Sequence, residues 1–456
     1  MSKTIIIIGA GLAGLSAALQ AAENGCNVKL VSSLPSERAQ SVMAEGGINA
    51  ALNTKDENDS PEEHFTDTIK AACGLADPNA VWGMTQAAPE LVHWLLKLGV
   101  KFNMSGYDDV DLRNFGGQKK KRTAFAQSDT GKQIMTAMID AVRRKEASGM
   151  VERFSHHSFL TLRLCGNICC GCVIRDEYSQ ETVELPGDAV IVATGGMHGL
   201  FGNTTGSLSN TGEVTAELFR LGVPLANGEM IQYHPTTVKC GGKRMLISEA
   251  ARGEGGRLFA MKDGKQWYFM EEKYPELGNL MPRDITAREI WKVSHESEVF
   301  LDMTEISEEI ISNKLSGLAD DCMTYLHKDI RKEPVSVLPG IHYFMGGILV
   351  DEQHRTPIQN LYAAGECCAQ YHGANRLGGN SLLGALYGGR VAAKSACEQA
   401  DVVDLSCATQ IDFPPASQTS EIKQLNKVMQ ETMGVVRNEN TLLNGIQTVQ
   451  ALTGNL

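Results

Sequence analysis

The chain has 456 residues, 43% hydrophobic and 21% charged, an ordinary globular composition long enough for about two or three domains. Its formal net charge of -12 argues against nucleic acid or an anionic membrane as the main partner. No segment reaches the roughly 18 consecutive apolar residues of a membrane span. With no export signal recognised, the twelve cysteines indicate a reducing, cytoplasmic setting.

The N-terminal segment, Lys3 to Ser33, predicts a dinucleotide-binding unit. It reads as an apolar strand, a glycine turn, an Ala- and Leu-rich helix and a second strand. Gly9, Gly11 and Gly14 form G-x-G-x-x-G at the first turn, where the backbone can approach a pyrophosphate at the helix N-terminus. The second strand ends at Ser32 rather than at the acidic residue that commonly binds a ribose hydroxyl.

Two later segments predict further strands of the same domain. "DAVIVATGG", which contains Gly195, and "QNLYAAGE", which ends at Glu366, each run from an apolar strand into small residues. Such strand ends meet at a common crevice, where these folds bind their ligand. Both segments on one chain are typical of FAD rather than NAD enzymes.

The nucleotide domain is therefore expected to be discontinuous. We predict an α/β fold whose Rossmann-like part comprises residues 1–228 and 340–410, interrupted by an inserted segment at 229–339. Residues 411–456 begin with a polar stretch and then become helical, so they predict part of a C-terminal helical region.

Four cysteines crowd into "CGNICCGC", which raises the question of an iron–sulfur site. Gly166 and Asn167 lie between two apolar runs and predict a hairpin turn instead. Adjacent side chains of a strand point to opposite faces, so the four thiols are not expected to converge on one cluster. We therefore predict no metal site. The four are Cys165, Cys169, Cys170 and Cys172.

The remaining motifs follow in a recognisable order. "AEGG", "FGGQKKKRTAFAQSDTG", "IQYHPT", "RGEGG", "PRD", "HYFMGG" and "HGANRLGGNSL" together resemble the flavoprotein subunits of fumarate reductase and succinate dehydrogenase, with L-aspartate oxidase a close relative. The resemblance spans nearly the whole chain. It implies an FAD-dependent oxidoreductase in which the inserted α+β segment is a capping domain.

The resemblance also implies a set of cofactor-binding residues. Gly46 and Gly47 should pack against the flavin ring, and Glu213 replaces the shorter aspartate usual in the family. Many members bond the flavin covalently to a histidine, but Gln40 stands at that position here. An amide nitrogen is no nucleophile, so we expect non-covalent FAD. The predicted cofactor-binding residues are Gly9, Gly11, Gly14, Ser32, Ser41, Gly46, Gly47, Gly195, Glu213, Glu366, Ser381 and Leu382.

The same resemblance predicts a dicarboxylate substrate. Arg376 offers a bidentate fork for one carboxylate, with His234 and His342 beside it. Ser248 keeps a hydroxyl where threonine is usual, and Phe115 is expected at the substrate. Phe344 is expected near the substrate, where the family motif has a small hydroxyl residue, and this leaves a related unsaturated acid open as substrate.

Reduction of a C=C bond needs a hydride and a proton, and the family's proton donor corresponds to Arg283. Glu249 and Arg252 would relay protons to it. An arginine, with a pKa above about 12, can serve only beside charged neighbours and a strongly basic acceptor. His64, His93, His156, His157, His198 and His354 are predicted to be structural. "KKKR", ending at Arg122, is given no role.

Three functions are weighed: a fumarate reductase or succinate dehydrogenase, an L-aspartate oxidase, and a dicarboxylate binder without turnover. Oxidases place a glutamate, as partner for the substrate ammonium, where Phe115 stands here. The presence of Arg283 with its relay argues against a mere binder. We therefore predict a reductase or dehydrogenase biased to fumarate reduction. An iron–sulfur subunit or another donor would supply electrons, with no direct membrane span but possible placement at the inner membrane face through partners.

Overall fold

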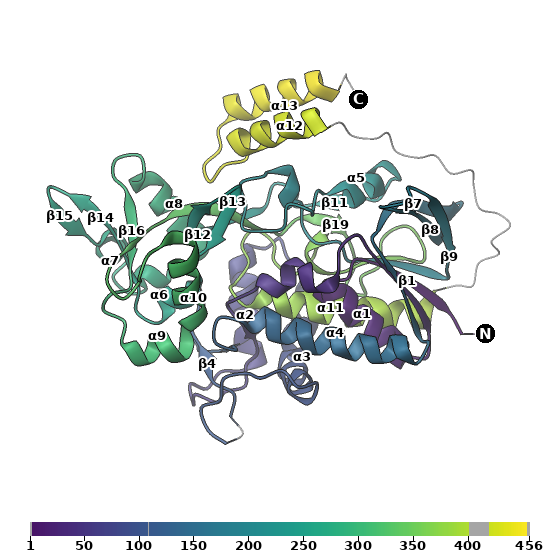
Figure 1. Ribbon diagram of the computed structural model, residues 1–456, viewed down its shortest axis with the longest axis horizontal. Helices are drawn as coiled ribbons and strands as arrows, with labels where there is room; N and C mark the ends of the chain where they lie inside the picture. The colour runs from purple at the N-terminus through teal and green to yellow at the C-terminus, as the bar shows by residue number, and fades with distance from the viewer. Residues whose placement is uncertain (1, 108, 401–418, 454–456) are drawn as a thin grey trace.

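A five-stranded parallel sheet forms the centre of the nucleotide domain (Figure 1). The computed structural model describes residues 2–107, 109–400 and 419–453. The strand order is β20-β10-β1-β2-β6. Their bounds are β1 (Thr4–Ile8), β2 (Asn27–Ser32), β6 (Val151–Ser155), β10 (Ala189–Val192) and β20 (Leu361–Ala363). The predicted discontinuous arrangement of the sheet is therefore confirmed.

The glycine motif shapes the junction between β1 and α1 (Leu12–Glu23). Gly9 has φ +112°, a conformation that favours glycine, and a Cβ there would collide with the Ala193 carbonyl. A Cβ on Gly14 would collide with the Gly9 carbonyl, so this glycine allows the helix to pack closely on the strand. The motif thus fixes both the turn and the approach of the helix.

Helices cover one face of the sheet and a second sheet covers the other. α11 (Asn380–Gln399) and α4 (Thr130–Ala147) pack beside α1. The opposite face carries the antiparallel sheet of β7 (His157–Cys165), β8 (Ile168–Asp176) and β9 (Thr182–Pro186), at the right of Figure 1. The predicted hairpin around Gly166 is confirmed, and its Cys169 and Cys172 lie in the core with Ile6.

The inserted segment, at the left of Figure 1, has a core of its own that includes Leu258, Ile290 and Leu301. Its first sheet joins β12 (Ile231–Cys240), β13 (Lys243–Leu246) and β18 (Leu338–Phe344). Its second joins β14 (Arg257–Lys262), β15 (Lys265–Trp267), β16 (Val299–Asp302) and β17 (Val335–Ser336). Two of its helices, α6 (Glu249–Gly253) and α8 (Arg283–Val293), each begin with a charged residue.

The domain boundaries themselves stay a prediction. The boundary placed after residue 339 falls inside β18, which pairs with β12 of the inserted segment. The boundary placed after residue 410 lies outside the described residues.

The C-terminal helices α12 (Thr419–Thr432) and α13 (Glu439–Thr453) form a hairpin above the rest of the chain in Figure 1. Met429 and Met433 pack against Phe201, Ile341 and Phe344. The predicted helical region is therefore present. Among the described residues, no helix has the length and apolar character that crossing a membrane requires.

Candidate active site

A cavity of about 660 Å³ follows the carboxyl ends of β1, β2, β10 and β20 and reaches the inserted segment. In open α/β sheets this edge is where ligands bind. Every predicted site residue lines the cavity except two. Gly14 packs the first helix against its strand, and Arg252 lies behind Glu249.

The nucleotide end of the cavity fits a dinucleotide cofactor. Ser32, at the end of β2, is 7% exposed, and its buried hydroxyl has no hydrogen-bond partner among the described residues. A buried polar atom without a partner is unfavourable unless a ligand satisfies it. Gly9 and Gly11 lie beside it on the cavity wall. Ser32 would therefore meet a polar group of bound FAD.

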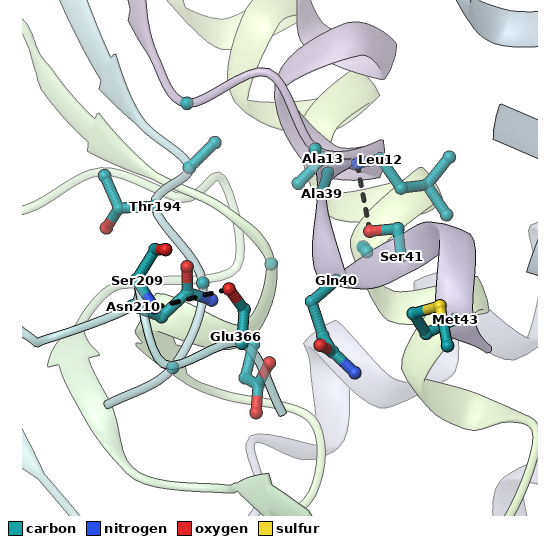
Figure 2. A pocket seen from close by; sticks show the side chains of 18 of the residues that line it. Leu12, Ala13, Ala39, Gln40, Ser41, Met43, Thr194, Ser209, Asn210 and Glu366 are labelled. Carbon is teal, nitrogen blue, oxygen red and sulfur yellow. Dashed lines mark hydrogen bonds between the residues drawn. The ribbon is translucent and has the colours of Figure 1, made fainter. Parts of the chain in front are cut away.

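The segment before the glycine pair borders the cavity at η2 (Gln40–Met43). The Ser41 hydroxyl accepts a hydrogen bond from the Leu12 amide at 3.2 Å, so it caps the start of α1 (Figure 2). Figure 2 shows Gln40 extending into the cavity on the side opposite Glu366. Gln40 thus has access to the bound cofactor, although its amide offers no nucleophile.

The glycine pair is shaped by its neighbours. Gly47 has φ +137°, and a Cβ there would lie 2.5 Å from the Ala124 carbonyl oxygen. A Cβ on Gly46 would lie 2.9 Å from the ring of Phe115, which is almost wholly buried. The two glycines therefore leave a flat backbone wall with an aromatic ring packed against it.

Arg283 and Glu249 form the charged centre of the inserted segment's side of the cavity. Arg283 Nε donates to Glu249 Oε2 at 2.8 Å, and Arg283 Nη2 lies 2.7 Å from the same oxygen. The other carboxylate oxygen accepts from the Gly116 amide at 2.9 Å. Arg283 Nη1 also donates to the Gln232 side-chain oxygen at 3.1 Å. Both charged side chains are almost completely buried.

Arg252 extends this pair away from the cavity. Its Nη2 lies 3.3 Å from Glu249 Oε1, and its Nη1 donates to the Asn279 carbonyl at 2.5 Å. Burial alone would raise the pKa of Glu249, but the charges of Arg283 and Arg252 outweigh it and hold that pKa below its usual value. The predicted relay residues are thus in contact in the order Arg283, Glu249, Arg252.

Arg376, from the segment that follows the inserted one, also lines the cavity. Its guanidinium carbon lies 4.2 Å from the centre of the Tyr343 ring, and its Nε is buried without a partner among the described residues. Burial first, and then the charge of Arg283, lower the pKa of Arg376 to about 9. A buried arginine with an unused donor is suited to a bidentate contact with a carboxylate.

Two histidines complete this group. The ring centres of His234 and His342 are 5.1 Å apart, and His342 Nδ1 lies 2.8 Å from the Thr205 hydroxyl. Burial, followed by the charge of Arg283, lowers the pKa of both histidines well below its usual value. His234 Nε2 has no partner within the described residues. Neutral rings of this kind can donate one N–H each to an anionic ligand.

Phe344 does not lie where the sequence suggested. Its side chain is 1% exposed and packs against Phe201 and His198, with ring centres 5.4 and 5.0 Å away. It is absent from the cavity lining, unlike its neighbour His342. The expectation that Phe344 stands near the substrate is therefore wrong, because the residue points into a core shared with α12. Ser248 does line the cavity, where its hydroxyl accepts from the Ala250 amide at 3.4 Å.

The sequence analysis missed several residues that line the cavity or lie directly behind it. Gln232 contacts Arg283 and also donates to the Arg376 carbonyl at 2.7 Å, and its place in "IQYHP" was the available signal. His156 and His157, expected to be structural, line the nucleotide end of the cavity. Glu45 also lines it, and burial, followed by Asp321, raises its pKa to about 8.

The sequence of this chain is similar to those of several known proteins. A family model described as an FAD binding domain matches residues 4–382. The succinate dehydrogenase flavoprotein subunit of Bacillus subtilis is 44% identical over 413 residues, covering 89% of this chain and 70% of that protein. The L-aspartate oxidase of Streptomyces coelicolor is 32% identical, covering 99% of this chain and 80% of the oxidase.

Solved structures agree with the sequence relatives. A variant of the Escherichia coli quinol fumarate reductase subunit FrdA superposes with a TM-score of 0.90 at 28% identity, covering 100% of this chain and 82% of that one. The fold and cavity thus define an FAD-dependent oxidoreductase. The chain belongs to the succinate dehydrogenase and fumarate reductase flavoprotein family, in which L-aspartate oxidases are also found.

Proposed function

We propose that this protein interconverts fumarate and succinate and is biased to fumarate reduction. The observation that supports this most directly is the buried Arg283–Glu249 pair, which lines one cavity with Arg376, His234 and His342. Arg283 and Arg376 line the cavity beside Glu249, and Arg252 lies behind that carboxylate. An anionic ligand with carboxylates at both ends complements that charge and the unpartnered donors.

Each residue has a role in this proposal. Arg376 binds one carboxylate, and His234, His342 and Ser248 bind the other or hold the carbon chain between them. Bound FAD would supply the hydride to one carbon of the double bond. Arg283 donates the proton to the other carbon, since the anion that develops there is strongly basic. A proton then passes from Arg252 to the Glu249 carboxylate and on to Arg283 along their 2.8 Å hydrogen bond, and solvent restores the proton of Arg252.

Aspartate oxidation is the second candidate, because an L-aspartate oxidase is among the relatives. An amino-acid substrate requires a free carboxylate for its ammonium group. Phe115 occupies the position where family oxidases carry that group, and Glu249 is already held by two arginines. These contacts favour a substrate without an ammonium group.

The direction of the reaction follows from Gln40. A covalent bond to the flavin withdraws electrons from the ring and raises its reduction potential. Without such a bond the flavin is a better donor than acceptor, which favours fumarate reduction over succinate oxidation. We expect sluggish succinate oxidation and negligible aspartate oxidation. The bias is measured from turnover rates at one pH. A reduced artificial dye serves as electron donor for fumarate, and an oxidised dye serves as acceptor for succinate and aspartate.

Each result of that comparison has a definite meaning. Fumarate reduction that exceeds succinate oxidation by a wide margin supports the proposal. Equal rates in the two directions would overturn the bias, and aspartate-dependent peroxide formation would assign the protein to the oxidase branch.

Non-covalent FAD is a separate expected result. After acid precipitation the yellow flavin should appear in the supernatant. The side chain of Gln40, which lines the cavity, has no nucleophilic atom that can bond covalently to the flavin. The absorbance of supernatant and pellet measures the release. Flavin that stays with the denatured pellet would contradict this prediction. Gln40→His, which restores a side chain able to form the covalent bond, is the comparison variant.

The physiological electron donor is proposed to be a separate protein, such as an iron–sulfur subunit. Several relatives are named as subunits of succinate dehydrogenase or fumarate reductase. Such a partner would also be what connects this chain to a membrane.

A further inference from the structure

His198 is a buried histidine that the proposed mechanism does not use. It lies in η3 (His198–Leu200), is 0% exposed and does not line the cavity. Its Nε2 lies 3.1 Å from Glu366 Oε1, and that same oxygen accepts from the Phe344 amide at 3.0 Å. Glu366 does line the cavity, on the wall formed by the end of β20. His198 therefore reaches the cofactor cavity only through Glu366.

The ring of His198 is held on every side that the structure describes. Phe344 packs edge-on against it at an interplanar angle of 83°. A Cβ on Gly206 would collide with the imidazole, so this glycine covers the ring closely. Nδ1 lies 2.8 Å from the Thr204 hydroxyl. Such confinement leaves one orientation for the ring.

The hydrogen bonds of this group fix where one proton lies. Glu366 Oε1 already accepts from the Phe344 amide, so His198 Nε2 is the donor in the contact between them. Thr204 also contacts the Ile341 carbonyl at 3.0 Å and accepts from the Gly206 amide at 3.1 Å. Whether Thr204 gives its hydrogen to His198 or to Ile341, Nε2 remains a donor to Glu366.

The loop that holds His198 also reaches the predicted substrate site. Thr205 follows Thr204 directly, and its hydroxyl lies 2.8 Å from His342 Nδ1. The Thr205 amide donates to the Ile341 carbonyl at 2.9 Å, which ties the loop to β18. Two adjacent threonines therefore orient two histidines, one behind the cofactor wall and one at the substrate.

We propose that His198 is a positioning residue for Glu366, and that the Thr204–Thr205 loop sets the cofactor contact and the substrate histidine separately. Phe344 packs against the ring of His198, so its proposed role is to hold that ring rather than to contact the substrate. The inference rests on the proposed contact of Glu366 with FAD. Its second part, on Thr205 and His342, rests also on the proposed dicarboxylate site, and neither part depends on the direction of turnover.

The test measures FAD binding to the full-length apoprotein by fluorescence quenching. His198→Phe keeps a planar ring but removes both ring nitrogens, including the donor to Glu366, so the FAD dissociation constant should rise at least about tenfold, as for one lost hydrogen bond to a carboxyl group. His198→Asn, which keeps an N–H donor, should recover part of that loss. His354→Phe is the control, because His354 is equally buried and bonds Ala363 and Tyr371 without lining the cavity.

A purely structural role predicts a different pattern. His198→Phe would then lower the melting temperature as His354→Phe does, while both bind FAD within twofold of the wild type, and the proposal would be overturned. If His198→Phe does not fold, the isosteric pair Thr204→Val and Thr205→Val decides. The first should weaken FAD about fivefold, and the second should weaken malonate, an unreactive dicarboxylate, with FAD unchanged. Equal effects of the two variants, or none, contradict the proposal.

Discussion

Arg283→Gln is expected to lower kcat for fumarate reduction by about 10²- to 10⁴-fold, the range associated with removal of a general acid. Arg283 is the proposed proton donor, and it holds Glu249 through contacts at 2.7 and 2.8 Å. FAD should remain bound, since the nucleotide end of the cavity is formed by other elements. Because a lost proton donor acts on the transition state, the effect should appear in kcat more than in dicarboxylate affinity. Steady-state rates with a reduced dye measure it.

The same helix supplies the control. Arg288 is half-exposed and lies 3.7 Å from Asp284, so Arg288→Gln should leave kcat within about twofold. Arg283→Lys keeps the charge but loses the planar fork, and it should remain strongly impaired. An Arg283→Gln enzyme with near-normal kcat would remove this residue from the mechanism.

Arg122→Leu is expected to lower the free energy of unfolding by about 3–5 kcal/mol. Arg122 is completely buried, and its Nη2 lies 2.8 Å from Asp59 and 3.0 Å from Asp67. Burial raises the pKa of Asp59 despite this arginine. Removal of Arg122 would leave two buried carboxylates without their cation. Urea denaturation, followed by circular dichroism, measures the loss.

The adjacent Lys121 provides a matched control. Its ammonium lies 3.7 Å from Glu57 and is half-exposed, so Lys121→Met should change stability by less than about 1 kcal/mol. Equal stability losses in the two variants would show that the buried ion pair contributes nothing particular. No loss in Arg122→Leu would contradict the account of this cluster.

The contrast between Arg122 and Lys121 shows that burial of a charged side chain could not be predicted from the sequence. "KKKR" reads as one basic run, yet its last residue enters the core and its third stays at the surface. Which side chain turns inward depends on Asp59 and Asp67, whose position relative to the run is set by the tertiary fold. Composition and spacing carry no such information.

Where geometry is local, the sequence predicted more. Gly9 and Gly14 are predictable from their spacing between an apolar strand and a helix, because a tight turn between the two requires glycine there. Phe344 was misplaced for the opposite reason. Its neighbours His198, Phe201 and Met429 come from distant segments, so the letter within its motif could not show that the ring points into a core. Likewise, nothing local marks His198 as a partner of Glu366.

A single-turnover experiment tests the central claim without any partner protein. The bound flavin is reduced anaerobically with light, fumarate is added, and the return of the oxidised flavin absorbance is followed beside product analysis. The account predicts rapid reoxidation with one succinate formed per flavin, and slow or no reoxidation when Arg283→Gln is used instead. Reduced flavin that stays reduced in the presence of fumarate, in protein shown to bind malonate, would contradict the proposed function.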